Sequence, residues 1–255
     1  MSGFSADLLS GRTVLVTGAS SGIGRAVAQQ VASLGGKVVA SGRDAGRLDA
    51  LIAGLPGQGH TAAPLALQDA DQVAEWGKSV AERCQGLDAI FHGAGIELIR
   101  PVRLTKAAQL QEVLASSLFA AFGLARAAAS KGVMRESGGS LLFMSSVAGM
   151  RGQAGMTAYS AAKGSIDALV RSLAVELASR HIRVNSLAAG AVRTEMHGRL
   201  TRALGPEAEA EYQARHLLGF GEPRDVSDVA LFLLSDLSRW VTGATWVVDG
   251  GYSIR

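Results

Sequence analysis

Three side chains of the kinds that move protons stand close together in the segment SVAGMRGQAGMTAYSAAK, residues 146–163. Tyr159 and Lys163 are four residues apart, so in a helix both lie on one face, about one turn from each other. A neighbouring ammonium favours the phenolate and lowers the pKa of a tyrosine from its ordinary value of about 10. Ser146 follows the apolar run SLLFM, which is typical of a strand. The pattern predicts that Tyr159 exchanges a proton near neutral pH, close to a hydroxyl at a strand end.

A strand, a glycine-rich turn and a helix stand near the start of the chain. The run TVLVT, residues 13–17, predicts a buried strand, and RAVAQQVASL, residues 25–34, predicts a helix. Between them, glycines permit a tight turn and a close backbone approach, and the helix N-terminus would face a pyrophosphate. The pattern predicts a dinucleotide site, with cofactor contacts from Gly18, Ser20, Ser21, Gly22, Ile23 and Gly24.

The glycine spacing G-x-x-x-G-x-G, with Ser146 and the Tyr-x-x-x-Lys pair behind it, resembles the short-chain dehydrogenase/reductase family over nearly the whole chain. The resemblance implies that Tyr159 is the general acid/base. Lys163 would lower the pKa of Tyr159 and hold the nicotinamide ribose, and Ser146 would polarise the substrate carbonyl. A Tyr-x-x-x-Lys pair alone also occurs on exposed helix faces, but its combination with the glycine turn favours the catalytic interpretation.

The residues after the predicted strand 37–41 bear on the choice of cofactor. An acidic residue about 20 positions after the glycines binds the ribose 2′-hydroxyl, whereas an arginine at this place binds a 2′-phosphate. Gly42 stands where NAD-preferring members of the resembled family carry Asp, and Arg43 follows it. Asp44 could compete as a ribose ligand but is better interpreted as the N-cap of the next helix. NADP(H) is therefore predicted over NAD(H), the alternative for Arg43 being a solvent-facing charge.

Two departures from the family occur in the next segments. Residues 61–67 predict a poor third strand containing Pro64, in which only a backbone cofactor contact at Leu67 is expected. Residues 87–92 predict a fourth strand, which runs into the turn formed by Gly93, Ala94 and Gly95. Gly93 stands where the family has an Asn, so the backbone path to the cofactor is kept but a side-chain amide is lost.

Ser117 is the most important departure. It lies in a predicted helix over residues 106–131, at the position where the resembled family has an Asn that completes a catalytic tetrad. In that family the Asn keeps a main-chain carbonyl free to hold a water that links Lys to solvent. The Ser117 hydroxyl could serve similarly by bonding a carbonyl one turn back, and Ser116 could do the same. The alternative is that both are small packing residues.

The second half of the chain predicts strands over 141–145 and 183–188, with a long helix around Tyr159 between them. The resemblance places Gly190, Val192 and Thr194 at the nicotinamide, and Ala189 where the family has Pro. Thr194 could also cap a helix. Residues 194–221 are predicted as a substrate-covering loop segment, polar and irregular, within one catalytic domain spanning residues 1–255.

Composition excludes several other classes of protein. The net charge of +3 is spread along the chain, which argues against a nucleic-acid surface, and no run approaches the ~20 apolar residues of a membrane span. Cys84 is the only cysteine, which precludes an intrachain disulfide, and a cytoplasmic location is expected. The histidines show no metal-binding spacing, so no metal is expected.

The alternation of strands and helices predicts one Rossmann-type, doubly wound α/β domain with a mostly parallel seven-stranded sheet and helices on both faces. The predicted function is NADP(H)-dependent hydride transfer between the nicotinamide and a carbonyl or secondary alcohol, with Tyr159 moving the proton. The substrate could be a 3-ketoacyl group, a sugar or another small ketone. A non-catalytic NADP-binding or scaffolding protein is the alternative. The apolar helix after Tyr159, together with the family, implies a homotetramer.

Overall fold

The computed structural model describes residues 3–66 and 68–255. Within them, seven parallel strands form one sheet in the order β3-β2-β1-β4-β5-β6-β7. The strand order reverses direction beside β1, which creates the crevice where sheets of this kind bind ligands. The predicted doubly wound α/β fold is confirmed. The strands are β1 Thr13–Thr17, β2 Lys37–Ser41, β3 Thr61–Ala62, β4 Ala89–His92, β5 Gly139–Ser146, β6 Ile182–Ala189 and β7 Thr245–Val248.

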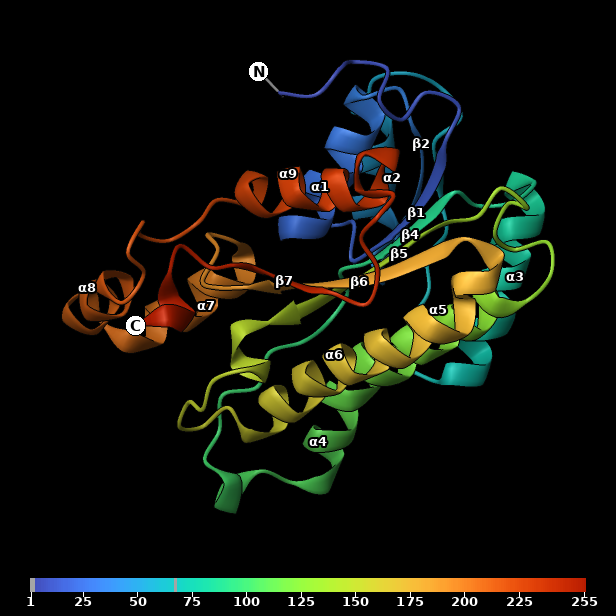
Figure 1. Ribbon diagram of the computed structural model, residues 1–255. Helices are drawn as coiled ribbons and strands as arrows, with labels where there is room; N and C mark the ends of the chain where they lie inside the picture. The colour runs from blue at the N-terminus through green and yellow to red at the C-terminus, as the bar shows by residue number, and fades with distance from the viewer. Residues whose placement is uncertain (1–2, 67) are drawn as a thin grey trace.

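Helices cover both faces of the sheet (Figure 1). One layer contains α1 Gly22–Ser33, α2 Ala45–Ala53 and α9 Pro223–Leu234. The other contains α3 Ala70–Cys84, α4 Ala107–Leu114, α5 Ala120–Ala129 and α6 Thr157–Leu177. Two further helices, α7 Glu195–Leu204 and α8 Pro206–Ala214, lie between β6 and α9 in the chain and project to one side of the molecule (Figure 1).

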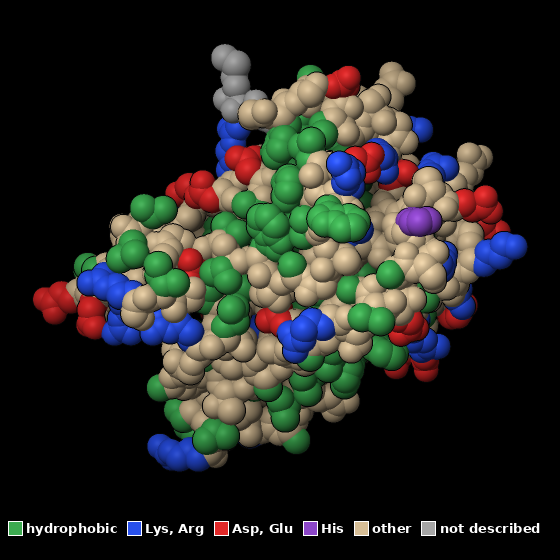
Figure 2. Space-filling model, viewed as in Figure 1, with side chains coloured by type: hydrophobic (Ala, Val, Ile, Leu, Met, Phe, Trp, Pro, Cys, Tyr) green, Lys and Arg blue, Asp and Glu red, His purple; other side chains and the backbone are tan. Residues whose placement is uncertain are grey.

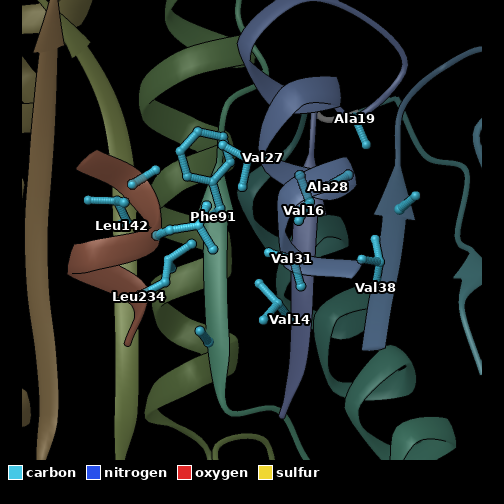
Figure 3. Packing of buried hydrophobic residues seen from close by; sticks show 14 of the residues in the cluster. Val14, Val16, Ala19, Val27, Ala28, Val31, Val38, Phe91, Leu142 and Leu234 are labelled. Atoms are coloured by element: carbon cyan, nitrogen blue, oxygen red, sulfur yellow. The ribbon is translucent and has the colours of Figure 1, made fainter. Parts of the chain in front are cut away.

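The strands form because their apolar, β-branched side chains are buried on both faces, as parallel sheets between helices require. Figure 3 shows one of the two cores, in which Val14 and Val16 of β1 pack with Val27 and Val31 of α1. Phe91, Leu142 and Leu234 extend this core across β4 and β5 to α9. The result is a rigid sheet that presents the ends of β1, β4, β5 and β6 at one edge.

Two helices begin at an aspartate whose side chain caps the first turn. Asp44 caps α2 by accepting a hydrogen bond from the Arg47 N–H at 3.0 Å, and Asp69 caps α3 by accepting from the Gln72 N–H at 2.8 Å. A side-chain oxygen at this position satisfies an N–H that the helix leaves free. Asp44 is therefore a cap, as predicted.

Three predicted segments differ in the structure. β3 is two residues long instead of seven, since Pro64 has no N–H to donate to a ladder. The predicted helix over 106–131 is a continuous helix over 107–129 whose middle, Ala115–Phe119, is π-helical. Residues 194–221, predicted to be irregular, contain α7 and α8.

Candidate active site

A cleft of about 1100 Å³ runs along the carboxyl ends of the strands. It brings together predicted site residues that are more than a hundred positions apart in sequence. Ser117 does not line the cleft directly, although its neighbour Ser116 does, and Leu67 lies outside the described residues. The lining includes Gly18, Ser20, Ser21, Gly22, Ile23, Gly24, Arg43, Gly93, Ala94, Gly95, Ser146, Tyr159, Lys163, Gly190, Val192 and Thr194.

The glycine turn has no room for side chains. A Cβ on Gly24 would lie 2.2 Å from the Gly18 carbonyl oxygen, and one on Gly18 would lie 2.8 Å from the Ala94 nitrogen. Gly18 also has φ +69°, which favours glycine. The Ser21 side chain makes no capping hydrogen bond, so the first N–H groups of α1 face the cleft without one. This cradle fits a pyrophosphate, the group that such a turn and helix N-terminus bind.

The end of β2 presents positive charge to the cleft. Arg43 is exposed, and no ion pair joins it to another part of the described chain. Gly42 keeps this corner open, because a Cβ there would lie 3.3 Å from Ser20 Oγ. Arg47, which the sequence analysis did not select, also lines the cleft, but its guanidinium pairs with Glu195 at 3.1 Å.

Tyr159, Lys163 and Ser146 meet on the other side of the cleft, across β4 from the glycine turn. The Ser146 hydroxyl hydrogen bonds to the Tyr159 phenol. Lys163 Nζ lies 5.7 Å from the centroid of the Tyr159 ring and donates to the Met144 carbonyl at 2.9 Å. Helix α6 thus places Tyr159 and Lys163 one turn apart, facing the end of β5, as the spacing predicts.

The predicted ionisation of Tyr159 is wrong. Burial raises the pKa of the Tyr159 phenol well above its usual value, and the negative charge of Glu97 raises it further, while the Ser146 hydrogen bond acts in the opposite direction. The Lys163 ammonium, which donates to a main-chain carbonyl of β5, does not offset these effects. At neutral pH Tyr159 is therefore a phenol that can donate a proton.

Lys163 is the group that titrates nearer to neutrality. Burial lowers the pKa of its ammonium to about 8, and the charge of Asp167 acts to raise it. Asp167 lies one turn further along α6 and is itself buried. Its carboxylate accepts hydrogen bonds from Ser145 at 3.0 Å, from Ser186 at 2.7 Å and from Thr245 at 3.2 Å. These three hydroxyls keep the negative charge in place beneath Lys163.

His92 and Ser117 form a buried connection that the sequence analysis missed. His92 Nε2 lies 3.3 Å from the Ser117 carbonyl oxygen, and Nδ1 lies 2.8 Å from Thr17 Oγ1. Because the carbonyl can only accept, Nε2 carries the proton and Nδ1 accepts from the Thr17 hydroxyl. Burial and the Lys163 charge lower the pKa of His92 to about 3, which keeps the ring neutral.

The Ser117 carbonyl that His92 contacts lies in the π-helical segment, where the ordinary helical ladder is interrupted. The predicted back-bond of Ser117 is absent: Ser116 Oγ donates to the Val113 carbonyl at 3.2 Å, whereas Ser117 Oγ has no partner among the described residues. A Cβ on Gly95 would lie 3.4 Å from Lys163 Nζ and 3.5 Å from Ser117 Oγ. The unpaired hydroxyl is therefore close to Lys163.

The loop after β6 completes the cleft. Thr194 caps α7 by accepting from the His197 N–H at 3.2 Å, and its Cγ2 lies 3.1 Å from where a Cβ on Gly22 would be. Its helix-capping role, one of the two considered from sequence, is confirmed. Gly190 has no space for a side chain, because its Cβ would lie 2.8 Å from Asp249 Cα. The backbone of this loop therefore passes close to the glycine turn.

His216, which follows α8, connects the end of this helical segment to the loop after β6. His216 accepts the Ala191 N–H at Nε2, at 3.2 Å, and donates from Nδ1 to the Tyr212 carbonyl at 3.1 Å. Its ring stacks on Tyr252 with centroids 4.6 Å apart. Sequence alone did not reveal these contacts of His216, because Ala191 and Tyr252 are more than twenty residues away from it.

Comparisons with known proteins agree on one family. Residues 18–253 match a family profile described as enoyl-(acyl carrier protein) reductase. A 3-oxoacyl-(acyl-carrier-protein) reductase of Thermotoga maritima is 34% identical over 96% of this chain and 99% of that protein. Carbonyl reductase family member 4 of Danio rerio is 32% identical over 95% of this chain and 98% of that protein.

Solved structures give the same result. A short-chain type dehydrogenase/reductase from Mycobacterium ulcerans superposes with a TM-score of 0.87 and 31% identity, covering 97% of this chain and 91% of that one. A putative NAD(P)-dependent gluconate 5-dehydrogenase from Beutenbergia cavernae, with NADP bound at low occupancy, has a TM-score of 0.86 and 33% identity, covering 98% of this chain and all (100%) of the other. The chain described here belongs to the short-chain dehydrogenase/reductase family of oxidoreductases.

Proposed function

We propose that this protein is an NADP(H)-dependent carbonyl reductase or alcohol dehydrogenase in which Tyr159 transfers the proton. The observation that carries the proposal is the half-buried Tyr159 phenol, hydrogen-bonded to Ser146, in the same cleft as a glycine cradle suited to a pyrophosphate. The cofactor, when bound, supplies or accepts the hydride. The chain contributes positioning and electrostatics.

In the reducing direction, one hydride adds to the carbonyl carbon, one proton adds to its oxygen, and NADPH becomes NADP⁺. Ser146 and Tyr159 would both donate hydrogen bonds to the carbonyl oxygen. Tyr159 then releases its proton as negative charge develops on that oxygen. The raised pKa of the phenol keeps the proton on Tyr159 until the substrate oxygen becomes basic.

The adenosine end of the cleft supports a preference for NADP(H). Arg43 is free to pair with a 2′-phosphate, and Gly42 offers no carboxylate to a ribose hydroxyl. The structure related to this chain from Beutenbergia cavernae is described with NADP bound. Gly190, Val192 and Thr194 would hold the nicotinamide end, and Lys163 would reach the adjoining ribose.

A screen of ketones with NADPH tests this proposal. Purified protein should oxidise NADPH in the presence of at least one ketone, and the product should be the corresponding alcohol. Binding of NADPH without turnover of any ketone would instead favour the non-catalytic alternative.

The pH dependence of reduction should follow Lys163. The ammonium is present below its pKa of about 8 and is lost as the pH rises through that value, so kcat should fall above about pH 8. Because the Asp167 charge raises this pKa, Asp167→Asn should move the alkaline limb of the kcat profile to lower pH. An unchanged limb in Asp167→Asn would show that another group controls it.

Ser117 should contribute to proton delivery through its unpaired hydroxyl. Ser117→Ala removes a buried hydroxyl that has no partner, so folding stability should be kept or increased, while kcat should fall a few-fold. Thermal unfolding and steady-state kinetics on the same preparation measure both effects. An unchanged kcat at every pH tested would make Ser117 a packing residue only.

Assembly into a homotetramer is proposed from the exposed apolar side chains and the family. Figure 2 shows hydrophobic side chains gathered near the middle of one face, over the region of α9 and β7. Trp240, between these two elements, is 93% exposed, and Val175 of α6 is 81% exposed. A second copy of the chain would cover such surface. Light scattering at micromolar concentration should give about four times the chain mass, and a monomer would contradict the proposal.

We also propose that the protein acts in the cytoplasm on a small molecule, with residues 194–221 covering the substrate in a single catalytic domain. Among the described helices, Ala107–Ala129 is long and apolar enough to cross a membrane, and 56% of its apolar 18-residue stretch is buried in the protein. This helix packs against α3 and α6, as a core helix does.

A further inference from the structure

A carboxylate that the proposed reaction does not use stands in the substrate half of the cleft. Glu97 follows the turn 93–95 and lines the cleft together with Gln153, Met156, Tyr159 and Tyr212. Burial is the main cause that raises the pKa values of the Tyr159 and Tyr212 phenols, that of Tyr212 to about 12, and the Glu97 charge raises both further. Glu97 therefore shares the cleft with Tyr159 of α6 and Tyr212 of α8 and lies within electrostatic reach of both.

Among the described side chains, those of residues 3–66, 68–199, 201 and 205–255, the Glu97 carboxylate finds no hydrogen-bond or ion-pair partner. Arg199 of α7 attracts it electrostatically but does not form an ion pair with it. Burial raises the pKa of Glu97 from its usual value. A partly buried carboxylate without a partner is costly, and a substrate group that donates hydrogen bonds would offset the cost.

The charges around the cleft limit which donor would fit. A substrate carboxylate next to Glu97 would be repelled, and a plain alkyl chain would leave the acid unsatisfied. A substrate ammonium would pair with Glu97 but would share the cleft with the cations Lys163 and Arg199. A hydroxyl group is neutral, so no charge repels it, and it donates one hydrogen bond, so Glu97 is not left unsatisfied.

We propose that Glu97 is a specificity-determining residue that accepts a hydrogen bond from a hydroxyl group beside the reacting carbonyl, so that the substrates are hydroxylated ketones, such as those derived from sugars and polyols. This inference rests on the proposed reductase function and narrows its substrate class. Glu97 would orient the carbonyl towards Tyr159 and Ser146 through the neighbouring hydroxyl.

The test compares ketones of the same skeleton with and without the hydroxyl. Cyclohexanone is paired with 2-hydroxycyclohexanone, and butanone with 1-hydroxy-2-butanone, each reduced with NADPH by the full-length protein. The measured quantity is the ratio of kcat/KM for the hydroxylated ketone to that for the plain ketone. The variants are Glu97→Gln and Glu97→Leu, with Glu82→Gln, on the exposed side of α3, as the control for loss of one negative charge.

The wild-type ratio should exceed one. Glu97→Leu should lower it by about tenfold or more, the effect of one hydrogen bond to a charged group, and Glu97→Gln should lower it less, since the amide oxygen still accepts. Glu82→Gln should leave the ratio unchanged. Activity on the plain ketone shows whether each variant has folded. Because this activity is the denominator of the ratio, any general effect of the Glu97 charge on Tyr159 cancels.

Three results would overturn the inference while leaving the reductase function intact. The first is a wild-type ratio below one. The second is a ratio that is the same in Glu97→Leu as in the wild type. The third is a preference of the wild type for 1-amino-2-butanone over 1-hydroxy-2-butanone. A wild-type protein that reduces no ketone with NADPH would overturn the reductase function itself, and the inference with it.

Discussion

Tyr159→Phe should lower kcat for ketone reduction by at least about a hundredfold, with NADPH binding retained. General acid catalysis contributes about 10²- to 10⁴-fold in rate, and the substitution removes only the transferable proton. The phenylalanine ring can keep the packing of the tyrosine ring on α6. Stopped-flow or steady-state kinetics measure kcat, and quenching of NADPH fluorescence measures binding.

A matched variant separates proton donation from hydrogen bonding. Ser146→Ala removes the hydroxyl that hydrogen bonds to Tyr159 but leaves the phenol proton in place, so kcat should fall by less than in Tyr159→Phe. The Tyr159 assignment fails if Tyr159→Phe retains more than a tenth of the wild-type kcat, a difference in barrier below about 1.4 kcal/mol.

Arg43→Ala should weaken NADPH binding by about ten- to a hundredfold and change NADH binding little. A charge-assisted hydrogen bond between guanidinium and phosphate has a strength of about 1.5 to 3 kcal/mol, and NADH has no 2′-phosphate to form it. Arg43 is exposed at the mouth of the cleft and has no ion pair in the described part of the chain, so its replacement should not disturb the fold.

NADH is the internal control for this variant, because it uses the same pyrophosphate cradle. Dissociation constants for both cofactors, measured by fluorescence titration, give the preference directly. Equal weakening of the two cofactors would show that Arg43 supports the loop rather than the 2′-phosphate. Arg47→Ala, which breaks the pair with Glu195, tests whether the second arginine in this corner contributes.

Local patterns predicted the sheet and the placement of the site well. The apolar runs at 13–17 and 37–41 coincide with β1 and β2, and Asp44 caps the helix that follows β2. These features depend on hydrophobic periodicity and on side chains that bond within three residues. The ends of the strands then bring the predicted residues into one cleft, because parallel strands end at a common edge.

Features that depend on tertiary contacts were not predictable in this way. The segment 194–221 is polar, so it gave no periodic signal, yet aromatic contacts of Tyr212 and His216 hold its end against Tyr252. The protonation of Tyr159 depends on burial and on Glu97, which lies sixty-two positions away (159 − 97). His92 is the last residue of an apolar strand, so the sequence gives no sign of its contacts with Thr17 and Ser117.

Transfer of deuterium from labelled NADPH tests the central claim most directly. NADPH carrying two deuterium atoms at C4 of the nicotinamide ring is incubated with the protein and a ketone from the screen, and the alcohol is analysed by mass spectrometry and NMR. The proposed reaction predicts one deuterium on the carbinol carbon with the wild-type protein, and at least a hundredfold less labelled alcohol per unit time with Tyr159→Phe. NADPH oxidation that leaves no deuterium on that carbon, or equal labelling rates in the two proteins, would contradict it.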